Sequence, residues 1–266
     1  MTATVAFSGA IPEYYERYLV PVLFDPFAAD LVARIAVRDP LRVLELACGT
    51  GAVTRRLRAA LPASATIVAT DLSPAMIALA SHAGPADGVT WQRADAQALP
   101  FDDASFDTVI CQFGLMFLPD KVRGFQEARR VLAPGGQLLA NVWDSPAANP
   151  YAAEMAAALE RLFPVDPPRF VAMVHGYCDT ERIAADLRAA GWDDVRIDRV
   201  AIQGRARSAE DFATGFANGS PIRQLLADRA TEPEVFVREL TPRLIALGGD
   251  TPFTPALAAI VLSAIR

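Results

Sequence analysis

Short apolar runs alternate with helix-like segments through residues 43–143, and this alternation restricts the fold more than any other feature of the chain. A helix between successive strands makes those strands parallel, and right-handed crossovers place helices on both faces of one sheet. The pattern therefore predicts an α/β fold. The expected strands are residues 43–46, 66–70, 89–92, 106–111 and 137–143, and the expected helices are residues 51–60, 73–81 and 121–131.

The rhythm changes after residue 143. Gly191 is expected to stop a helix, and Pro134-Gly135-Gly136 is expected to form a turn before the fifth strand. The last apolar run reads as helix or strand, and its β-rich centre favours a strand. The later expected elements are helices at 151–163 and 180–190, a strand at 194–202, a helical segment at 208–247 broken at Gly215, Gly219 and Pro221, and a strand at 256–265.

Charge and composition exclude several classes of protein. The formal net charge of −6 argues against broad attraction to a nucleic-acid backbone. The three cysteines and two histidines lack the spacing of a metal site or a disulfide framework, which favours free thiols in the cytoplasm. No apolar run approaches about 18 residues and no signal peptide is indicated, so we expect no membrane span.

A glycine-containing loop follows the first expected strand, and two classes of cofactor compete for it. A dinucleotide site needs a third glycine where Thr54 stands in Gly49-Thr50-Gly51-Ala52-Val53-Thr54. Glu45, four residues before Gly49, would repel a pyrophosphate and attract a cation. S-adenosyl-L-methionine (SAM) carries an ammonium and a sulfonium but no phosphate, so the loop favours SAM.

Acidic residues also follow the second and third expected strands. Asp71 is placed to accept both ribose hydroxyls, although it would do the same for NAD. Asp95 can accept a hydrogen bond from an adenine amino group, and the Ala96 amide can face a ring nitrogen. Leu72 and Met76 offer apolar surface to the purine. Carboxylates at the ends of three neighbouring strands are hard to explain by packing alone.

Each of these residues also has a structural explanation. Glu45 could pair with a helix N-terminus, Asp71 could cap a helix, and Met76 could belong to the core. Ser73 is the expected N-cap of the helix that Pro74 begins.

Five ordered motifs then resemble a known family. ELACGTG, ATDLSPAMIALA, RADAQALPFDDASFD, QFGLMFLPD and VLAPGG are similar to the successive motifs of class I SAM-dependent methyltransferases, in particular the small-molecule branch with the ubiquinone/menaquinone methyltransferases. The likeness covers about residues 40–143. It implies a Rossmann-like, seven-stranded, mostly parallel sheet with an antiparallel last strand beside the fifth. Ala47 stands where the family more often has glycine.

The resemblance also implies a layout for the whole chain. We expect a single domain over residues 1–266, with N-terminal lid helices at 1–39, a SAM-binding core at 40–143, and helical caps over the acceptor site at 144–178 and 208–247. Tyr15 or Tyr18 can reach the methionine end of the cofactor, or both can serve only packing. The expected cofactor contacts are Tyr15, Glu45, Ala47, Gly49, Thr50, Gly51, Asp71, Leu72, Met76, Asp95, Ala96 and Gln112.

The function implied is methyl transfer from SAM to a small-molecule acceptor. His175 is the candidate general base, against the alternative of a structural histidine. The acceptor, the methylated atom and a homodimeric assembly stay open. A non-catalytic SAM-binding protein and a NAD-dependent oxidoreductase are the competing hypotheses.

Overall fold

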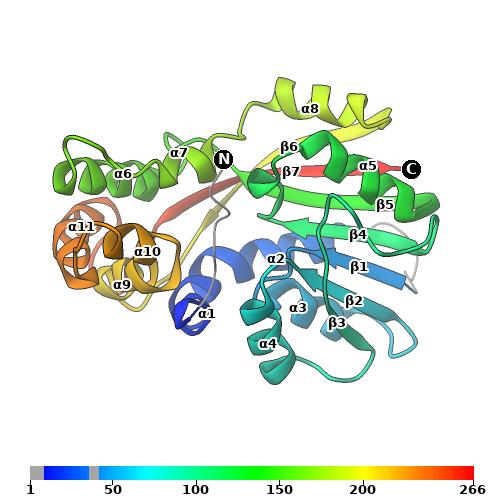
Figure 1. Ribbon diagram of the computed structural model, residues 1–266, viewed down its shortest axis with the longest axis horizontal. Helices are drawn as coiled ribbons and strands as arrows, with labels where there is room; N and C mark the ends of the chain where they lie inside the picture. The colour runs from blue at the N-terminus through cyan, green and yellow to red at the C-terminus, as the bar shows by residue number, and fades with distance from the viewer. Residues whose placement is uncertain (1–8, 36–41) are drawn as a thin grey trace.

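A seven-stranded sheet lies at the centre of the computed structural model, which describes residues 9–35 and 42–266 (Figure 1). Strands β1 to β5 pair in parallel, and β7 runs antiparallel between β5 and β6. The seven strands and the antiparallel last strand beside the fifth are confirmed. In sheet order they are β3 (Val89–Arg93), β2 (Thr66–Asp71), β1 (Arg42–Leu46), β4 (Phe106–Gln112), β5 (Leu132–Trp143), β7 (Ala256–Ile265) and β6 (Asp194–Gln203).

Helices cover both faces of this sheet because alternate strand residues point to opposite sides. Leu44 packs in one apolar cluster with Phe125 and Leu187, which lie on α5 and α8. Val43 packs in the other cluster with Val53 and the rest of the α3 face. The helices of these two layers are α2 (Asp25–Ala33), α3 (Ala52–Ala60), α4 (Pro74–Ala83), α5 (Lys121–Val131) and α8 (Thr180–Ala189).

Strand β5 begins earlier than the sequence indicates. Phe106 pairs with Leu132 and Thr108 with Gln137, so residues 133–136 form a bulge within the strand. Pro134-Gly135-Gly136 therefore lies within β5, and the prediction of a turn before it is wrong. Gly135 has a φ of +78°, and its amide donates to the Arg266 carbonyl at 3.2 Å. The chain end thus closes the bulge.

A second group of helices gathers beyond the carboxyl ends of the parallel strands (Figure 1). Helix α9 packs against the N-terminal helix η1 and against α11, while α11 packs against α6. The group consists of α1 (Ile11–Tyr14), η1 (Tyr15–Phe24), η2 (Leu115–Phe117), α6 (Pro150–Leu162), α7 (Phe170–His175), α9 (Ala209–Gly219), α10 (Ile222–Ala227) and α11 (Pro233–Gly248).

Gly215 does not break the helical segment, as the sequence suggested, but lies inside α9. A Cβ at this position would approach the Tyr18 Cβ to 2.8 Å. At the end of α9, a Cβ on Gly219 would lie 2.5 Å from the Tyr15 backbone nitrogen. Both glycines thus allow close packing of α9 on η1.

Residues 1–8 and 36–41 fall outside the described part of the chain, and with them part of the expected lid at 1–39 and the first residues of the expected core at 40–143. Within residues 9–35 and 42–266, no helix is both long enough and apolar enough to cross a bilayer.

Candidate active site

The loop between β1 and α3 lies at the carboxyl edge of the sheet. Gly51 has a φ of +87°, and a Cβ there would come within 2.8 Å of the Trp91 ring, so this position requires glycine. Gly49 has a φ of +54°, and its Cβ would stand 3.8 Å from the Tyr15 hydroxyl. The Cys48 amide donates to the Thr70 carbonyl at 2.8 Å. The loop is therefore fixed to β2 and presents its backbone toward Tyr15.

Glu45 is buried beneath this loop. The Thr54 hydroxyl, in the first turn of α3, donates to Glu45 Oε2 at 2.5 Å. The pKa of Glu45 is raised to about 8, mainly by burial and also by the nearby charge of Asp71, against the lowering effect of the Thr54 hydrogen bond. A large share of Glu45 is neutral at pH 7 in the free protein. A cation bound beside it would favour the ionised form.

Asp71 ends β2 and binds two backbone amides. Its Oδ2 accepts from the Gly49 amide at 2.9 Å, and its Oδ1 accepts from the Ser73 amide at 2.8 Å. Burial raises the pKa of this carboxyl, and the amides oppose the shift. The Ser73 hydroxyl accepts from the Met76 amide at 3.4 Å, so Ser73 is the N-cap of α4, as expected. The alternative that Asp71 is that cap is wrong.

Asp95 lies two residues beyond the end of β3, not at its end as the sequence suggested. The Ala94 amide donates to the Asp71 carbonyl at 3.2 Å, which keeps this loop beside β2. Asp95 Oδ1 accepts from the Gln97 amide at 2.9 Å. The backbone here is thus held at the same edge of the sheet as Asp71.

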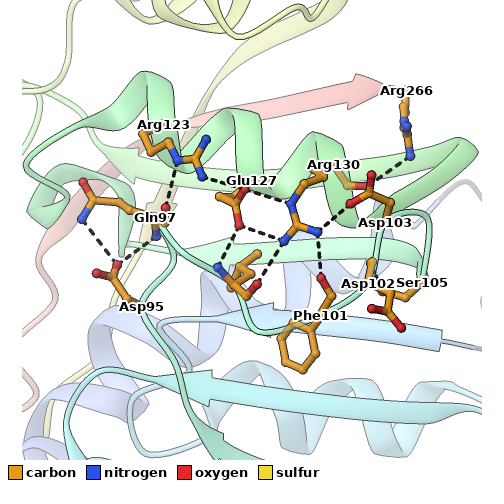
Figure 2. A network of polar contacts seen from close by, with 11 residues as sticks. Asp95, Gln97, Phe101, Asp102, Asp103, Ser105, Arg123, Glu127, Arg130 and Arg266 are labelled. Carbon is orange, nitrogen blue, oxygen red and sulfur yellow. Dashed lines mark hydrogen bonds and ion pairs between the residues drawn. The ribbon is translucent and has the colours of Figure 1, made fainter.

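A polar network fastens the rest of this loop to α5 (Figure 2). Arg130 donates to both carboxylate oxygens of Glu127, to the Phe101 carbonyl and to Asp103, all at 2.7–2.9 Å. Glu127 in turn accepts from the Leu99 amide at 2.8 Å, and its pKa is lowered mainly by Arg130. The network keeps the loop that carries Asp95 in one place.

A small cavity opens next to the glycine loop, and we call it the polar cavity. Two buried polar atoms on its wall, Thr50 Oγ1 and Gln112 Oε1, have no hydrogen-bond partner within the described residues. Gln112 Nε2 donates to the Phe24 carbonyl at 3.2 Å. The polar cavity is lined by Tyr15, Phe24, Glu45, Ala47, Cys48, Thr50, Ala52, Val53 and Gln112.

Helix η1 supplies two of these lining residues, Tyr15 and Phe24, and is a π-helix over its ten residues. Its i→i+5 bonds put more residues in a turn than an α-helix has, so nine residues make about two turns instead of two and a half. Tyr15 and Phe24 therefore lie on one face, with ring centroids 4.8 Å apart. Pro21, inside η1, has no N–H to donate and crowds the preceding turn, which suits the wider helix.

A second, larger cavity shares Tyr15 and Phe24 with the polar cavity, and we call it the aromatic cavity. About 540 Å³ of space within it is not filled by protein atoms, and part of this space is open solvent. The lining comes from the N-terminal helix, the edge of the sheet and the helices beyond it, and consists of Tyr15, Leu19, Leu23, Phe24, Phe113, Phe117, Trp143, Tyr151, Met155, Phe170, Val174, His175, Phe216, Ser220 and Pro221.

His175 ends α7 and is buried against this cavity. Its Nδ1 lies 2.8 Å from the Asp144 carbonyl oxygen. Burial lowers the pKa of His175 below its usual 6.5. The ring is therefore neutral at neutral pH.

The remaining expected residues line neither cavity. Leu72 is 48% exposed beside Asp71, and Ala96 lies in the loop after β3. Met76 is only 3% exposed, in line with its alternative role in the core. Tyr18 stacks on Tyr14 with centroids 5.9 Å apart, on the side of η1 that meets α9. Of the two tyrosines considered, Tyr15 is the one that lines both cavities.

Sequence reasoning did not identify Phe113, which follows Gln112 and lines the aromatic cavity. Its φ of +50° is unusual for a bulky residue. Its amide donates to Asn141 Oδ1 at 3.0 Å, and its ring stacks on Trp143 with centroids 3.9 Å apart. Strained backbone of this kind collects at functional sites. The buried Asn141, on a strand otherwise apolar here, is the one feature that points to it.

Comparison with known proteins assigns the family. Residues 44–140 match the methyltransferase domain family. A demethylmenaquinone methyltransferase of Deinococcus radiodurans is 32% identical over 176 residues, which cover 60% of this chain and 71% of that protein. The chain belongs to the class I SAM-dependent methyltransferases.

Two further comparisons show how far the similarity to known proteins extends. An uncharacterized protein of Mycobacterium tuberculosis is 38% identical over 123 residues, and the chain spans only 43% of that relative's length. A solved phosphoethanolamine N-methyltransferase of Haemonchus contortus, in complex with S-adenosylhomocysteine (SAH), has the same fold at 17% identity. Its TM-score is 0.62, over 96% of this chain and 56% of that one.

The residues of this chain are compatible with the methionine end of SAM at the polar cavity. Glu45 offers a carboxylate, and the unpaired oxygens of Thr50 and Gln112 can accept hydrogen bonds from an ammonium. The side of Asp71 and Asp95 suits the nucleoside, because both carboxylates lie at the same edge of the sheet. None of the described residues form a group of three His, Cys, Asp or Glu side chains that could hold a metal.

Proposed function

We propose that this chain is a SAM-dependent methyltransferase that acts on a small-molecule acceptor. One observation carries the proposal: the polar cavity and the aromatic cavity meet at Tyr15 and Phe24. A cofactor whose amino-acid end lies in the polar cavity has the aromatic cavity next to it. Methyl transfer needs this adjacency, because the acceptor must reach the methyl group in line with the bond that breaks.

Different polar residues contact different parts of the cofactor. Glu45, Thr50 and Gln112 bind the amino-acid end, and the backbone of Gly49 and Gly51 allows close approach. Asp71 binds the ribose hydroxyls. Asp95 and the Ala96 amide bind the adenine, with the exposed Leu72 beside it. Ala47 and Tyr15 bound the amino-acid end, while Met76 supports the site from the core.

Bound SAM supplies an activated methyl group on a sulfonium. The chain then has to hold the acceptor in line and keep water away, effects that can lower a barrier by up to about 7–11 kcal/mol. The apolar walls of the aromatic cavity suit both tasks. Residues 144–178 and 208–247 act as caps over the acceptor, because Met155, Phe170 and Phe216 line the cavity from these segments. The described part of residues 1–39 forms the lid between the two cavities.

The relatives support an enzyme. The Deinococcus relative is named as a demethylmenaquinone methyltransferase, which supports a small-molecule acceptor for this chain. A non-catalytic SAM-binding protein would not need a second cavity adjoining the first. A NAD-dependent oxidoreductase would place a pyrophosphate near Glu45 and would find Thr54 at the third glycine position.

The test is a calorimetric titration of SAM, SAH and NAD into the protein, followed by an assay of SAH release with a broad panel of small acceptors. We expect SAM and SAH to bind, NAD not to bind, and SAH to be released with some acceptors. Binding of NAD alone would overturn the proposal. Tight SAM binding with no turnover on any acceptor would favour the regulatory alternative.

A further inference from the structure

The aromatic cavity has no charged wall. Among the fifteen described residues that line it, eight are aromatic, and none is Lys, Arg, Asp or Glu. A carboxylate or phosphate acceptor would find no cation to pair with and would lose its hydration without compensation. Aromatic faces suit a flat ring, through offset or edge-to-face contacts. The lining therefore suits an uncharged aromatic acceptor better than a carboxylate or a phosphate.

His175 is the one basic side chain among the described residues that line this cavity. Its hydrogen bond fixes the tautomer of the imidazole ring. The Asp144 carbonyl can only accept, so Nδ1, 2.8 Å away, carries the ring proton. The other nitrogen, Nε2, then holds a lone pair on a ring that lines the cavity. Since the ring is neutral at neutral pH, this lone pair can take a proton.

Few titratable groups face this ring. Directly after β5, the Asp144 carboxylate is paired with Arg199 at 3.0 Å. On α6, the Tyr151 phenol packs with its ring centroid 6.1 Å from that of His175, and burial raises its pKa. Helix η2, which also packs on α7, has only Leu, Met and Phe. The ring thus has a basic nitrogen without a nearby free carboxylate that would hold it protonated.

We propose that the acceptor is an uncharged aromatic hydroxyl compound and that His175 Nε2 is the base that takes its hydroxyl proton. The inference rests on the proposed function and adds the substrate class and the catalytic group. An oxygen lone pair of the acceptor forms the bond to the methyl carbon while the proton passes to Nε2. The bond from that carbon to sulfur breaks, its electron pair stays on sulfur, and the imidazolium returns its proton to water.

Acceptors of matched size test the substrate class. SAH release is measured with a phenol, an amine and a carboxylate that share one bicyclic aromatic ring, and the product is identified by NMR. We expect a methyl ether, with kcat/KM for the phenol at least about tenfold above that for the other two. An amine that outperforms the phenol, held by the aromatic faces as a cation, would overturn the class, and a ring-methylated product would overturn the oxygen as the methylated atom.

His175→Asn tests the base. The asparagine amide can still donate to the Asp144 carbonyl in place of Nδ1, but it offers no basic nitrogen. For phenols with a pKa near about 10, kcat should fall by roughly 10²-fold or more. For phenols already ionised at the assay pH, the loss should be less than about fivefold. An equal loss along the whole series would show a positioning role and overturn the proposal.

Two controls keep the outcomes apart. Tyr151→Phe removes the hydroxyl of the tyrosine that packs beside the His175 ring. The dependence of kcat on acceptor pKa should stay unchanged in this variant. The pH profile of the wild-type protein tests the base without depending on the folding of any variant. For weakly acidic phenols, kcat/KM should rise with pH through an apparent pKa below 6.5. For phenols that are already ionised, this rise should be absent. A profile without that rise for weakly acidic phenols would contradict the base. Failure of every acceptor despite SAH binding would instead refute methyl transfer itself.

Discussion

The polar cavity and the aromatic cavity adjoin each other, yet they draw their residues from the chain in opposite ways. Six of the nine residues around the polar cavity lie between Glu45 and Val53. The aromatic cavity collects fifteen residues between Tyr15 and Pro221, from helices, loops and a strand end. Under the proposed function, the cofactor site is built mainly from one strand, one loop and the start of one helix, whereas the acceptor site is assembled by tertiary packing of distant segments.

The largest effect should come from the cofactor side. Asp71→Ala removes the proposed acceptor of the ribose hydroxyls and should weaken SAH binding by about 1.5–3 kcal/mol, roughly 10–150-fold. Calorimetry measures this loss, and the acceptor KM should change little.

Asp71 also accepts from the Gly49 and Ser73 amides, so stability should fall too. A ligand-side control separates the two effects. A 2′-deoxy analogue of SAH should lose much less affinity than SAH does when Asp71 is replaced. Equal losses for both ligands would remove Asp71 from the ribose site.

Glu45 gives the next effect, through its proton. With a pKa near 8, the carboxyl should lose its proton when an ammonium binds beside it. Binding of SAH at pH 7 should therefore release part of a proton, measurable as a dependence of the calorimetric enthalpy on the buffer. Glu45→Gln should abolish this release and weaken SAM and SAH alike, because the ammonium is common to both. Proton release that persists in the variant would assign it to another group.

The same carboxyl should affect the stability of the free protein. Its pKa in the folded state is about 8 against a usual 4.5, so the folded state binds more protons between these values. Its contribution to stability is fully present below about pH 4.5 and is lost as the pH rises through about 8. The stability of wild type relative to Glu45→Gln should fall over that window, as followed by urea denaturation.

Features of this arrangement that arise from residues close together in the sequence can be predicted from it, whereas features that arise from contacts between distant segments cannot. The strand ends with Glu45 and Asp71 were predictable because period and turn residues act locally. Gly215 was misread because a glycine that permits helix packing looks the same in sequence as one that ends a helix. Tyr15 and Phe24 share a face only in a π-helix, whose hydrogen-bond spacing leaves no pattern in the side chains.

The aromatic cavity offers a smaller test from its own side. Phe216 stacks on Tyr151 with centroids 5.8 Å apart and lines the cavity. Phe216→Leu keeps much of the volume but removes an aromatic face, and should raise the acceptor KM by about threefold to tenfold. SAH affinity should not change. Phe212, one turn earlier on α9, does not line the cavity but packs behind it against Tyr151, Phe216 and Phe253. Phe212→Leu is therefore the control for lost packing, and it should lower stability while raising the acceptor KM less than Phe216→Leu does.

The smallest effect concerns Ala47, which lies on the wall of the polar cavity with a φ of +52°. A left-handed backbone costs a residue with a Cβ about 1–2 kcal/mol, while glycine adds about 0.4–1 kcal/mol of unfolded-state entropy. Ala47→Gly should therefore stabilise the protein by up to about 1 kcal/mol. In chains of about 150–250 residues, 1 kcal/mol raises Tm by about 2–4 °C, and we expect a similar rise here.

Two alanines provide the controls for that change. Ala104 has a φ of +56° in the loop before β4, away from both cavities, so Ala104→Gly should stabilise to a similar extent and leave SAH affinity untouched. Ala69 is fully buried within β2, where glycine only loses contacts and entropy, so Ala69→Gly should destabilise. If Ala47→Gly behaves like Ala69→Gly, the methyl group of Ala47 contributes more to packing at the loop than its backbone strain costs, and the alanine found where the family more often has glycine is a favourable substitution of this chain.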